Sequence, residues 1–255
     1  MSVPSELEAW QDRLEAAMHQ KDDAACVVRI YQQTSSTQDV AKSFAPSKAL
    51  IIADQQTAGR GRLGRQWVSS PGASILMSFV WPSSDSTLTH DRLSILSGIA
   101  VAQVVQQLLP STTVRLKWPN DVLVEDQKIA GILIEKVGEA FVIGIGLNVT
   151  QGSAADPALD LIATYLEAHG PQCDRLVVIE RMITALNHAF RTTSPEEMLS
   201  SWRGLASLGQ TQTFEHNNQR ITGEVLDLDP DHGLIVRRDS GEIVTLPAAT
   251  TSVVK

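Results

Sequence analysis

The chain has little cysteine: Cys26 and Cys173 are its only two, and they lie far apart among 255 residues. Two distant cysteines without metal-ligand spacing exclude a disulfide framework and give no indication of a zinc site. No apolar run reaches the length that crosses a membrane, and the N-terminus lacks the basic and apolar regions of a signal peptide. These absences favour a cytoplasmic protein that binds no membrane.

Positive charge is also scarce. The chain has 21 Lys and Arg residues against 29 Asp and Glu residues, a net charge of −8, whereas a general nucleic-acid binder needs a basic face. The six histidines share no cluster, and no Ser-His-Asp or Cys-His arrangement is recognisable. We therefore expect chemistry that depends on positioning and charge stabilisation, without a covalent protein nucleophile.

Against this acidic background, one segment concentrates positive charge. Residues 59–67 read Gly-Arg-Gly-Arg-Leu-Gly-Arg-Gln-Trp. Glycine lets the backbone approach a ligand closely, and its amides can form an anion-binding concavity. Arginine offers a planar, permanently charged fork for carboxylate or phosphate. The segment predicts an anion site.

Gly59, Gly61 and Gly64 match the dinucleotide pattern Gly-x-Gly-x-x-Gly, but their context excludes that interpretation. The pattern must open a helix and be followed about twenty residues later by an acidic residue; here a loop and then an apolar strand follow. A Walker A loop is excluded because Arg65-Gln66 replaces Lys-Ser/Thr. A merely solvated basic loop would not need Trp67, an aromatic ring suited to stacking a base.

Apolar periodicity predicts an α+β protein. The expected helices cover residues 5–18, 36–44, 91–109, 157–169, 174–190 and 195–202. The expected strands cover residues 27–31, 49–53, 74–81, 114–118, 122–124, 129–137 and 141–147, with a polar loop over 55–72 and a hairpin turn over 125–128.

From about residue 205 the sequence pattern changes. Short segments of alternating apolar and polar residues follow at 211–215, 221–228, 234–238 and 243–246, separated by tight turns. Such a pattern predicts a small β-barrel. We therefore expect a catalytic domain over residues 1–204, with a helical extension over 1–25, and a second domain over 205–255.

Three further motifs carry candidate site residues. Lys117-Trp118-Pro119-Asn120-Asp121 follows a strand, and Pro119 keeps Trp118 extended, although an ordinary hairpin turn explains the motif equally well. Lys128 heads an apolar strand that contains Gly131, a glycine suggesting close backbone approach. The segment 144–148, Gly-Ile-Gly-Leu-Asn, ends a strand and could accept a flat ring.

Together with Ser36-Thr37-Gln38 and Gln56-Thr57-Ala58, these motifs follow the order of the biotin protein ligase family, which the chain resembles from about residue 28 onward. The resemblance implies a class II synthetase-like mixed sheet with a small SH3-like C-terminal barrel. It implies that biotin and Mg-ATP give biotinyl-5′-AMP and pyrophosphate. The biotinyl group then passes to a lysine of a biotin carboxyl carrier domain of a biotin-dependent carboxylase.

The resemblance also assigns roles to residues, and Gln38 departs from the asparagine that many members have. The implied biotin contacts are Ser36, Thr37, Gln56, Arg60, Arg62, Lys128 and Gly131. The implied ATP contacts are Arg60, Arg62, Arg65, Trp67, Lys117 and Asn148, with Trp67 stacking on adenine and Gly131 and Gly144 leaving room for the nucleotide. The implied catalytic residues are Lys128, Arg62 and Asp121, and Asp121 is also the candidate Mg²⁺ ligand.

Several alternatives stay open. Lipoate ligases and octanoyl transferases share the fold but generally lack the Gly-Arg-Gly-Arg run. A nucleic-acid-binding module with a basic loop is a non-enzymatic rival. The stretch before residue 28 is too short for the DNA-binding domain of bifunctional family members, so we expect a ligase that binds no DNA, and family sheets often pair edge to edge in homodimers.

Overall fold

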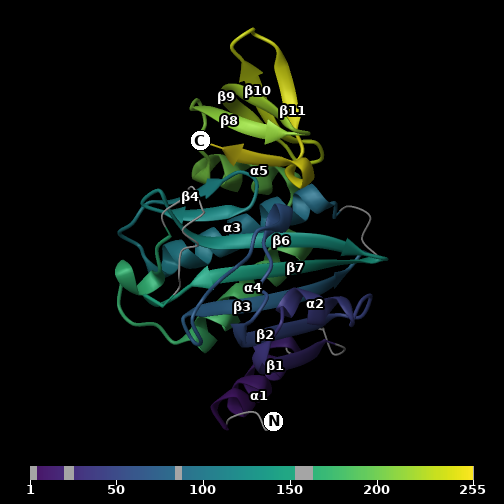
Figure 1. Ribbon diagram of the computed structural model, residues 1–255, viewed down its shortest axis with the longest axis vertical. Helices are drawn as coiled ribbons and strands as arrows, with labels where there is room; N and C mark the ends of the chain where they lie inside the picture. The colour runs from purple at the N-terminus through teal and green to yellow at the C-terminus, as the bar shows by residue number, and fades with distance from the viewer. Residues whose placement is uncertain (1–4, 20–25, 84–87, 153–162, 255) are drawn as a thin grey trace.

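The computed structural model describes residues 5–19, 26–83, 88–152 and 163–254. A seven-stranded sheet with its helices forms the larger part, and a five-stranded sheet lies at one end of the long axis (Figure 1). The helices are α1 (Ser5–His19), α2 (Thr37–Lys42), α3 (His90–Leu108), α4 (Arg175–Thr192) and α5 (Pro195–Leu205), and short 3₁₀ turns are η1 (Arg62–Gly64), η2 (Leu166–Ala168) and η3 (Ala248–Thr250).

The larger sheet has the strand order β1-β2-β3-β7-β6-β5-β4. Its strands are β1 (Val27–Thr34), β2 (Ala49–Gln56), β3 (Ser74–Pro82), β4 (Val114–Lys117), β5 (Asp121–Val124), β6 (Gln127–Val137) and β7 (Ala140–Asn148). Only β1 and β2 run parallel, and the other neighbouring pairs are antiparallel. The apolar strand β3 is buried along nearly its whole length, as expected where both faces of a sheet are covered.

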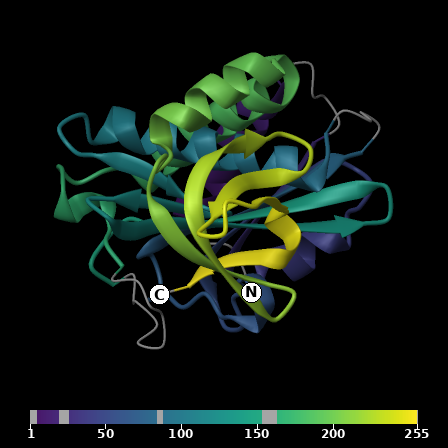
Figure 2. The ribbon, with the colours of Figure 1, turned by 90° about the horizontal axis from the view of Figure 1, so that it is seen from above.

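Helices cover the two faces of this sheet unequally. On one face α1, α3 and α4 bury the main core, to which β2 contributes Leu50 and Ile52. On the other face the short helix α2 packs against the alternate residues Ala49 and Ile51, as the period-two alternation of a strand requires. Figure 2 shows the longer helices gathered on one side of the sheet. Part of the α2 face is therefore left without a helix.

The smaller sheet is antiparallel, with the order β11-β10-β9-β8-β12. Its strands are β8 (Thr211–His216), β9 (Gln219–Asp229), β10 (Gly233–Arg238), β11 (Ile243–Leu246) and β12 (Thr251–Val254). Phe214 is fully buried in its interior, and the β8–β9 turn places Asn217 and Asn218 at positive φ, a typical hairpin geometry. The α+β class is confirmed, and this sheet is consistent with the expected SH3-like barrel.

One expectation about the secondary structure is wrong, and one strand of the smaller sheet was not expected. The helix predicted over 157–169 is absent from 163–169, where Ala163 bridges to Lys128 and only the single turn η2 follows; residues 157–162 lie outside the described part of the chain. Tertiary pairing has overridden the helical periodicity there. Strand β12 had no counterpart among the predicted strands.

Two element boundaries also differ, and both matter for the site. β2 continues through Gln55 and Gln56, so these residues belong to the sheet and not to the loop. The hairpin turn contains only Glu125 and Asp126, both at positive φ, and Lys128 therefore lies within β6. A two-residue turn of this geometry matches the twist of the strands that it joins.

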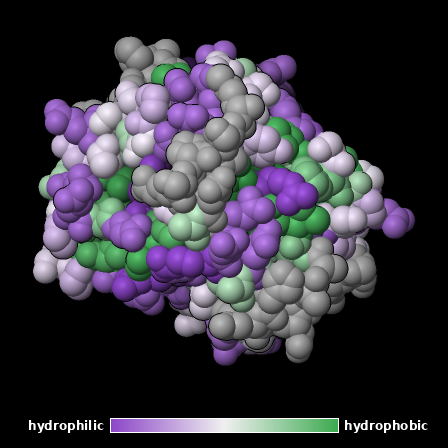
Figure 3. Space-filling view, turned by 90° about the horizontal axis from the view of Figure 1, so that it is seen from below, coloured by the Kyte–Doolittle hydropathy of each residue, from purple (hydrophilic) through white to green (hydrophobic). Residues whose placement is uncertain are grey.

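In the described ranges, no helix is both long enough and apolar enough to cross a membrane. On the end of the molecule opposite the smaller sheet, hydrophilic side chains separate the visible apolar groups (Figure 3).

Candidate active site

A cleft lies on the part of the α2 face that no helix covers. Along β7, Ala140 and Val142 pack beneath α2. Alternation then turns Gly144 and Gly146 toward the same side, where their partners on β6 are Leu133 and Gly131. The cleft above this strip contains about 1110 Å³ of space between atoms, counting its open mouth.

The residues predicted for the site converge on this cleft. Its lining includes Ser36, Thr37, Gln56, Arg60, Arg62, Arg65, Trp67, Lys117, Asp121, Lys128 and Gly131. Asn148 is absent from the lining: the residue is 4% exposed, and its side-chain amide donates to the Thr164 carbonyl at 3.0 Å. The structure therefore brings together every predicted site residue except Asn148.

The floor near the start of α2 is polar and hydrogen-bonded. Thr37 donates its backbone N–H and its hydroxyl to Gln56 Oε1, at 2.7 and 3.1 Å. Ser78, which the sequence prediction missed, lies 2.9 Å from the Thr37 hydroxyl. The hydroxyl oxygen of Ser36 is buried without a hydrogen-bond partner among the described residues. A buried, unsatisfied polar atom in a cleft is suited to a polar ligand.

Gln38 occupies the space above Gly144. Its Oε1 accepts a hydrogen bond from the Ser78 hydroxyl at 3.1 Å, and its Nε2 donates to the Val142 carbonyl at 3.1 Å. A Cβ atom on Gly144 would lie 2.5 Å from Gln38 Oε1. The missing side chain of Gly144 thus makes room for Gln38, whereas the resemblance implied room for a nucleotide.

Trp67 fills a second glycine-lined space. A Cβ on Gly146 would lie 2.5 Å from Trp67 Cε2, and one on Gly131 would lie 3.1 Å from Trp67 Cζ3. The Lys128 Nζ atom lies 5.7 Å from the centre of the indole ring, within the range of a cation–π interaction. The two glycines therefore set where the indole lies against the sheet.

The glycine-arginine loop turns back on itself beside the cleft. Gly61 donates its N–H to the Arg65 carbonyl at 2.8 Å, and Trp67 donates to the Gly59 carbonyl at 3.0 Å. A Cβ on Gly59 would lie only 2.3 Å from the Trp67 carbonyl oxygen, so this crossing requires glycine. At the tip Leu63 has a φ of 53° and is largely exposed.

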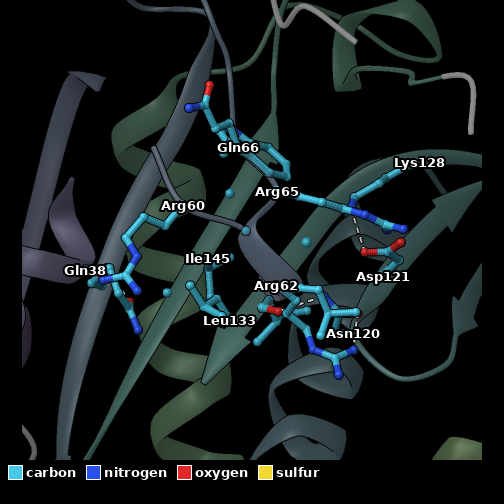
Figure 4. A pocket seen from close by; sticks show the side chains of 18 of the residues that line it. Gln38, Arg60, Arg62, Arg65, Gln66, Asn120, Asp121, Lys128, Leu133 and Ile145 are labelled. Atoms are coloured by element: carbon cyan, nitrogen blue, oxygen red, sulfur yellow. Dashed lines mark hydrogen bonds and ion pairs between the residues drawn. The ribbon is translucent and has the colours of Figure 1, made fainter. Parts of the chain in front are cut away.

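The three arginines of the loop have different surroundings (Figure 4). Arg60 lies on the Gln38 side and forms ion pairs with Asp39 of α2 and Glu135 of β6. The hydrogen bond with Asp39 raises the pKa of Arg60. Arg65 is exposed and lies on the other side, with Lys128. The loop therefore spreads its charge across the cleft.

Arg62 points away from both of these groups, toward the smaller sheet. Its Nη1 donates to Asn120 Oδ1 at 3.2 Å, and its Nη2 faces the carbonyl oxygens of Ala248, Ala249 and Thr251 at 2.5, 3.3 and 3.1 Å. Burial lowers the pKa of Arg62, while the carboxylate of Asp121 opposes this effect. Nothing in the local sequence around Arg62 indicates these distant partners.

Lys128 and Asp121 form the most buried ion pair that lines the cleft. Lys128 Nζ lies 2.6 Å from Asp121 Oδ1, and their side chains are 17% and 16% exposed. A register shift between β5 and β6 next to Lys128 brings the two strands' side chains together. Asn120, also missed by the sequence prediction, donates to the Ile132 carbonyl at 2.8 Å and so ties this turn to β6.

Asp121 is the carboxylate available for a cation here. In the described part of the chain, no three His, Cys, Asp or Glu side chains are grouped to hold a metal. Mg²⁺ commonly uses one or two carboxylates together with waters and substrate phosphates. Asp121 therefore fits a cation that arrives with a nucleotide and does not form a complete protein site.

A mixed sheet with this cleft and a small antiparallel sheet at its end is the architecture of a biotin protein ligase. The solved biotin protein ligase from Aquifex aeolicus in complex with biotin and ATP superposes with a TM-score of 0.78 and 26% identity, over 90% of this chain and 99% of that one.

The chain belongs to the biotin/lipoate A/B protein ligase family, whose model matches residues 27–150. It is 33% identical to the biotin–[acetyl-CoA-carboxylase] ligase of Mycobacterium tuberculosis, over 86% of each chain. It is 32% identical to the bifunctional ligase/repressor BirA of Bacillus spizizenii, over 83% of this chain and 70% of that protein.

Proposed function

We propose that the chain activates biotin with Mg-ATP to give biotinyl-5′-AMP and transfers the biotinyl group to a lysine of a biotin carboxyl carrier domain. The observation that carries this proposal is the division of one cleft into a polar floor and a cationic side. Ser36, Thr37 and Gln56 lie on the floor, and Lys128 and Arg65 lie on the cationic side.

The floor suits the ureido group of biotin. That ring presents two N–H donors and one carbonyl acceptor. Gln56 Oε1 and the hydroxyl oxygens of Ser36 and Thr37 can accept hydrogen bonds, and the hydroxyls can also donate. Because Ser36 has a buried oxygen without a partner among the described residues, binding there would satisfy a group that otherwise costs about 1–3 kcal/mol.

The cationic side suits the reacting groups. A carboxylate oxygen of biotin must approach the α-phosphorus of ATP, and both groups are negatively charged. Lys128 and the loop arginines would offset this repulsion and the charge that develops on the phosphoryl oxygens. The new carbon–oxygen–phosphorus linkage forms as the bond to pyrophosphate breaks. An acceptor lysine amine then attacks the activated carbonyl, and AMP leaves.

Asp121 would hold the Mg²⁺ that accompanies ATP, and the cation would neutralise charge on the phosphates. Trp67 lines the cleft and offers an aromatic face to the adenine base. Cytoplasmic location, absence of DNA binding and pairing of two copies through a sheet edge complete the proposal. Sedimentation of the purified chain tests the pairing.

Transfer to an acceptor tests the function as a whole. Purified chain, biotin, Mg-ATP and a biotin carboxyl carrier domain should give a singly biotinylated domain by mass spectrometry. A carrier whose acceptor lysine is replaced by arginine should stay unmodified. Modification with lipoate at a rate equal to that with biotin would favour the lipoate ligase alternative. Strong, salt-sensitive retention of DNA in a filter-binding assay would favour the nucleic-acid-binding alternative.

A further inference from the structure

The C-terminal sheet contacts Arg62 of the cleft through one short segment, residues 248–251, which consists of η3 and the first residue of β12. Its carbonyl oxygens surround the Nη2 group of Arg62. The next residues, Ser252 and Val253, line the cleft itself. Because backbone carbonyls are fixed dipoles, the course of this segment determines where the Arg62 guanidinium lies.

Asp91 holds this segment from the other side. It lies in the first turn of α3, is 7% exposed, and its Oδ2 accepts a hydrogen bond from the Ala248 N–H at 3.2 Å. Its other oxygen lies 3.0 Å from His90 Nδ1. A buried carboxylate requires partners, and here one partner is the backbone that binds Arg62. Asp91 also attracts the Arg62 charge directly.

We propose that Asp91 is a positioning residue for Arg62 and acts on it through residues 248–251. Asp91 fixes the Ala248 N–H, the segment then presents its carbonyls in one orientation, and these hold the guanidinium beside Asn120. The C-terminal sheet is thereby part of the active site. The kinetic consequence rests on the proposed function, since it assumes that Arg62 acts on the anions in the cleft.

A double-mutant cycle tests whether Asp91 acts through Arg62. Asp91→Ala should lower kcat/KM for biotin-dependent ATP–pyrophosphate exchange roughly 10-fold, and Arg62→Ala should lower it more. In the Arg62→Ala background, Asp91→Ala should change it less than about 2-fold, because the residue it positions is gone. An equal loss in both backgrounds would mean a general structural role and would overturn the proposal.

Two variants distinguish a loss of Arg62 positioning from a general loosening of the smaller sheet. Asp91→Asn keeps an oxygen that can accept from Ala248, so it should retain most of the activity; a loss as large as that of Asp91→Ala contradicts the route. Arg203→Ala removes another contact of the smaller sheet, the ion pair between Arg203 of α5 and Asp227 of β9. It should leave the exchange rate unchanged, and a loss like that of Asp91→Ala would contradict the specific role of Asp91.

A readout independent of activity uses trypsin. Arg62 is partly buried and bonded, whereas Arg65 is exposed. In Asp91→Ala, cleavage after Arg62 should rise several-fold relative to cleavage after Arg65, mapped by mass spectrometry in the full chain. An unchanged ratio overturns the proposal. Absence of exchange in the unmodified chain would count against the proposed function only, because the cleavage ratio does not depend on it.

Discussion

Lys128 Nζ lies 2.6 Å from Asp121 Oδ1, and the pair is mostly buried at the side of the cleft. The ion pair holds the amine at the side of the cleft, where a phosphoryl group would come to react. The carboxylate beside it can hold the lysine in place or bind a cation that arrives with the nucleotide. This relationship gives Lys128 a defined direction that a solvated hairpin lysine would lack.

Replacing this lysine should affect the reaction more than binding. Lys128→Ala should slow adenylate formation by about 10²–10³-fold, the effect of removing one group that stabilises developing charge, while the Kd for biotin changes much less. Stopped-flow or quench measurements with calorimetry give the two quantities. Lys136→Ala, on the same strand but exposed, is the matched control. Equal losses of rate and affinity would argue against a transition-state role.

Gly146 should be intolerant of a side chain because of Trp67. In Gly146→Ala the new Cβ would lie 2.5 Å from the indole, so the ring must move, and we expect a destabilisation of about 1–3 kcal/mol and a raised KM for ATP. Denaturant unfolding and exchange kinetics measure both. Gly204→Ala, where a Cβ meets nothing within 4 Å, should not destabilise the chain. If adding Gly146→Ala to Trp67→Ala costs as much as adding it to the unmodified chain, the indole is not the cause.

Gly144 should likewise be intolerant of a side chain, in this case because of Gln38. Gly144→Ala places a Cβ 2.5 Å from Gln38 Oε1, which would push the amide into the cleft, and we expect about 10-fold weaker biotin binding. The shorter side chain in Gln38→Asn should recover part of that loss in the double variant. Isothermal titration with biotin checks this. If the change in biotin-binding free energy of the double variant equals the sum of the changes in the two single variants, the two positions act independently.

Acid should weaken the contact between helix α5 and the smaller sheet. Arg203 of α5 forms a two-point pair with Asp227 of β9, at 2.9 and 2.6 Å, and this hydrogen bonding lowers the pKa of Asp227. The stabilisation is fully present above the ordinary aspartate pKa of about 4. It is lost as pH falls through the lower pKa of the folded state.

Arg203→Ala should therefore narrow the difference in urea midpoint between about pH 7 and about pH 3. Arg238→Ala, which removes a pair with Glu242 inside the smaller sheet, is the comparison variant. A midpoint difference unaffected by Arg203→Ala would mean that the pair contributes nothing to the pH dependence.

The sequence was sufficient for most of the architecture and for the residues of the cleft. The apolar run over residues 141–147 predicted strand β7, and the resemblance to the biotin protein ligase family placed Lys128 and Asp121 in one site. These signals are local, or are carried by short motifs, and so they can be read along the chain. The helix expected over 157–169 failed because pairing with Lys128 took precedence over helical periodicity at Ala163.

The contacts that the sequence did not predict are those between distant segments. Arg62 and Ala248 are 186 residues apart, and no local pattern indicates that one binds the other. The resemblance implied that Gly144 leaves room for a nucleotide. The side chain of Gln38, which is longer than the asparagine of many family members, fills that space. Asn148 matched a motif, yet its amide is used by Thr164. Each depends on how elements pack, which composition and periodicity do not encode.

Biotin-dependent exchange of labelled pyrophosphate into ATP tests the central claim most directly, because it reports reversible formation of the adenylate without any acceptor protein. The purified chain with Mg²⁺ should exchange label rapidly with biotin, slowly with lipoate and not at all without an acid. It should lose nearly all exchange in Lys128→Ala and none in Lys136→Ala. Absence of exchange with biotin, or equal exchange with lipoate, would contradict the account.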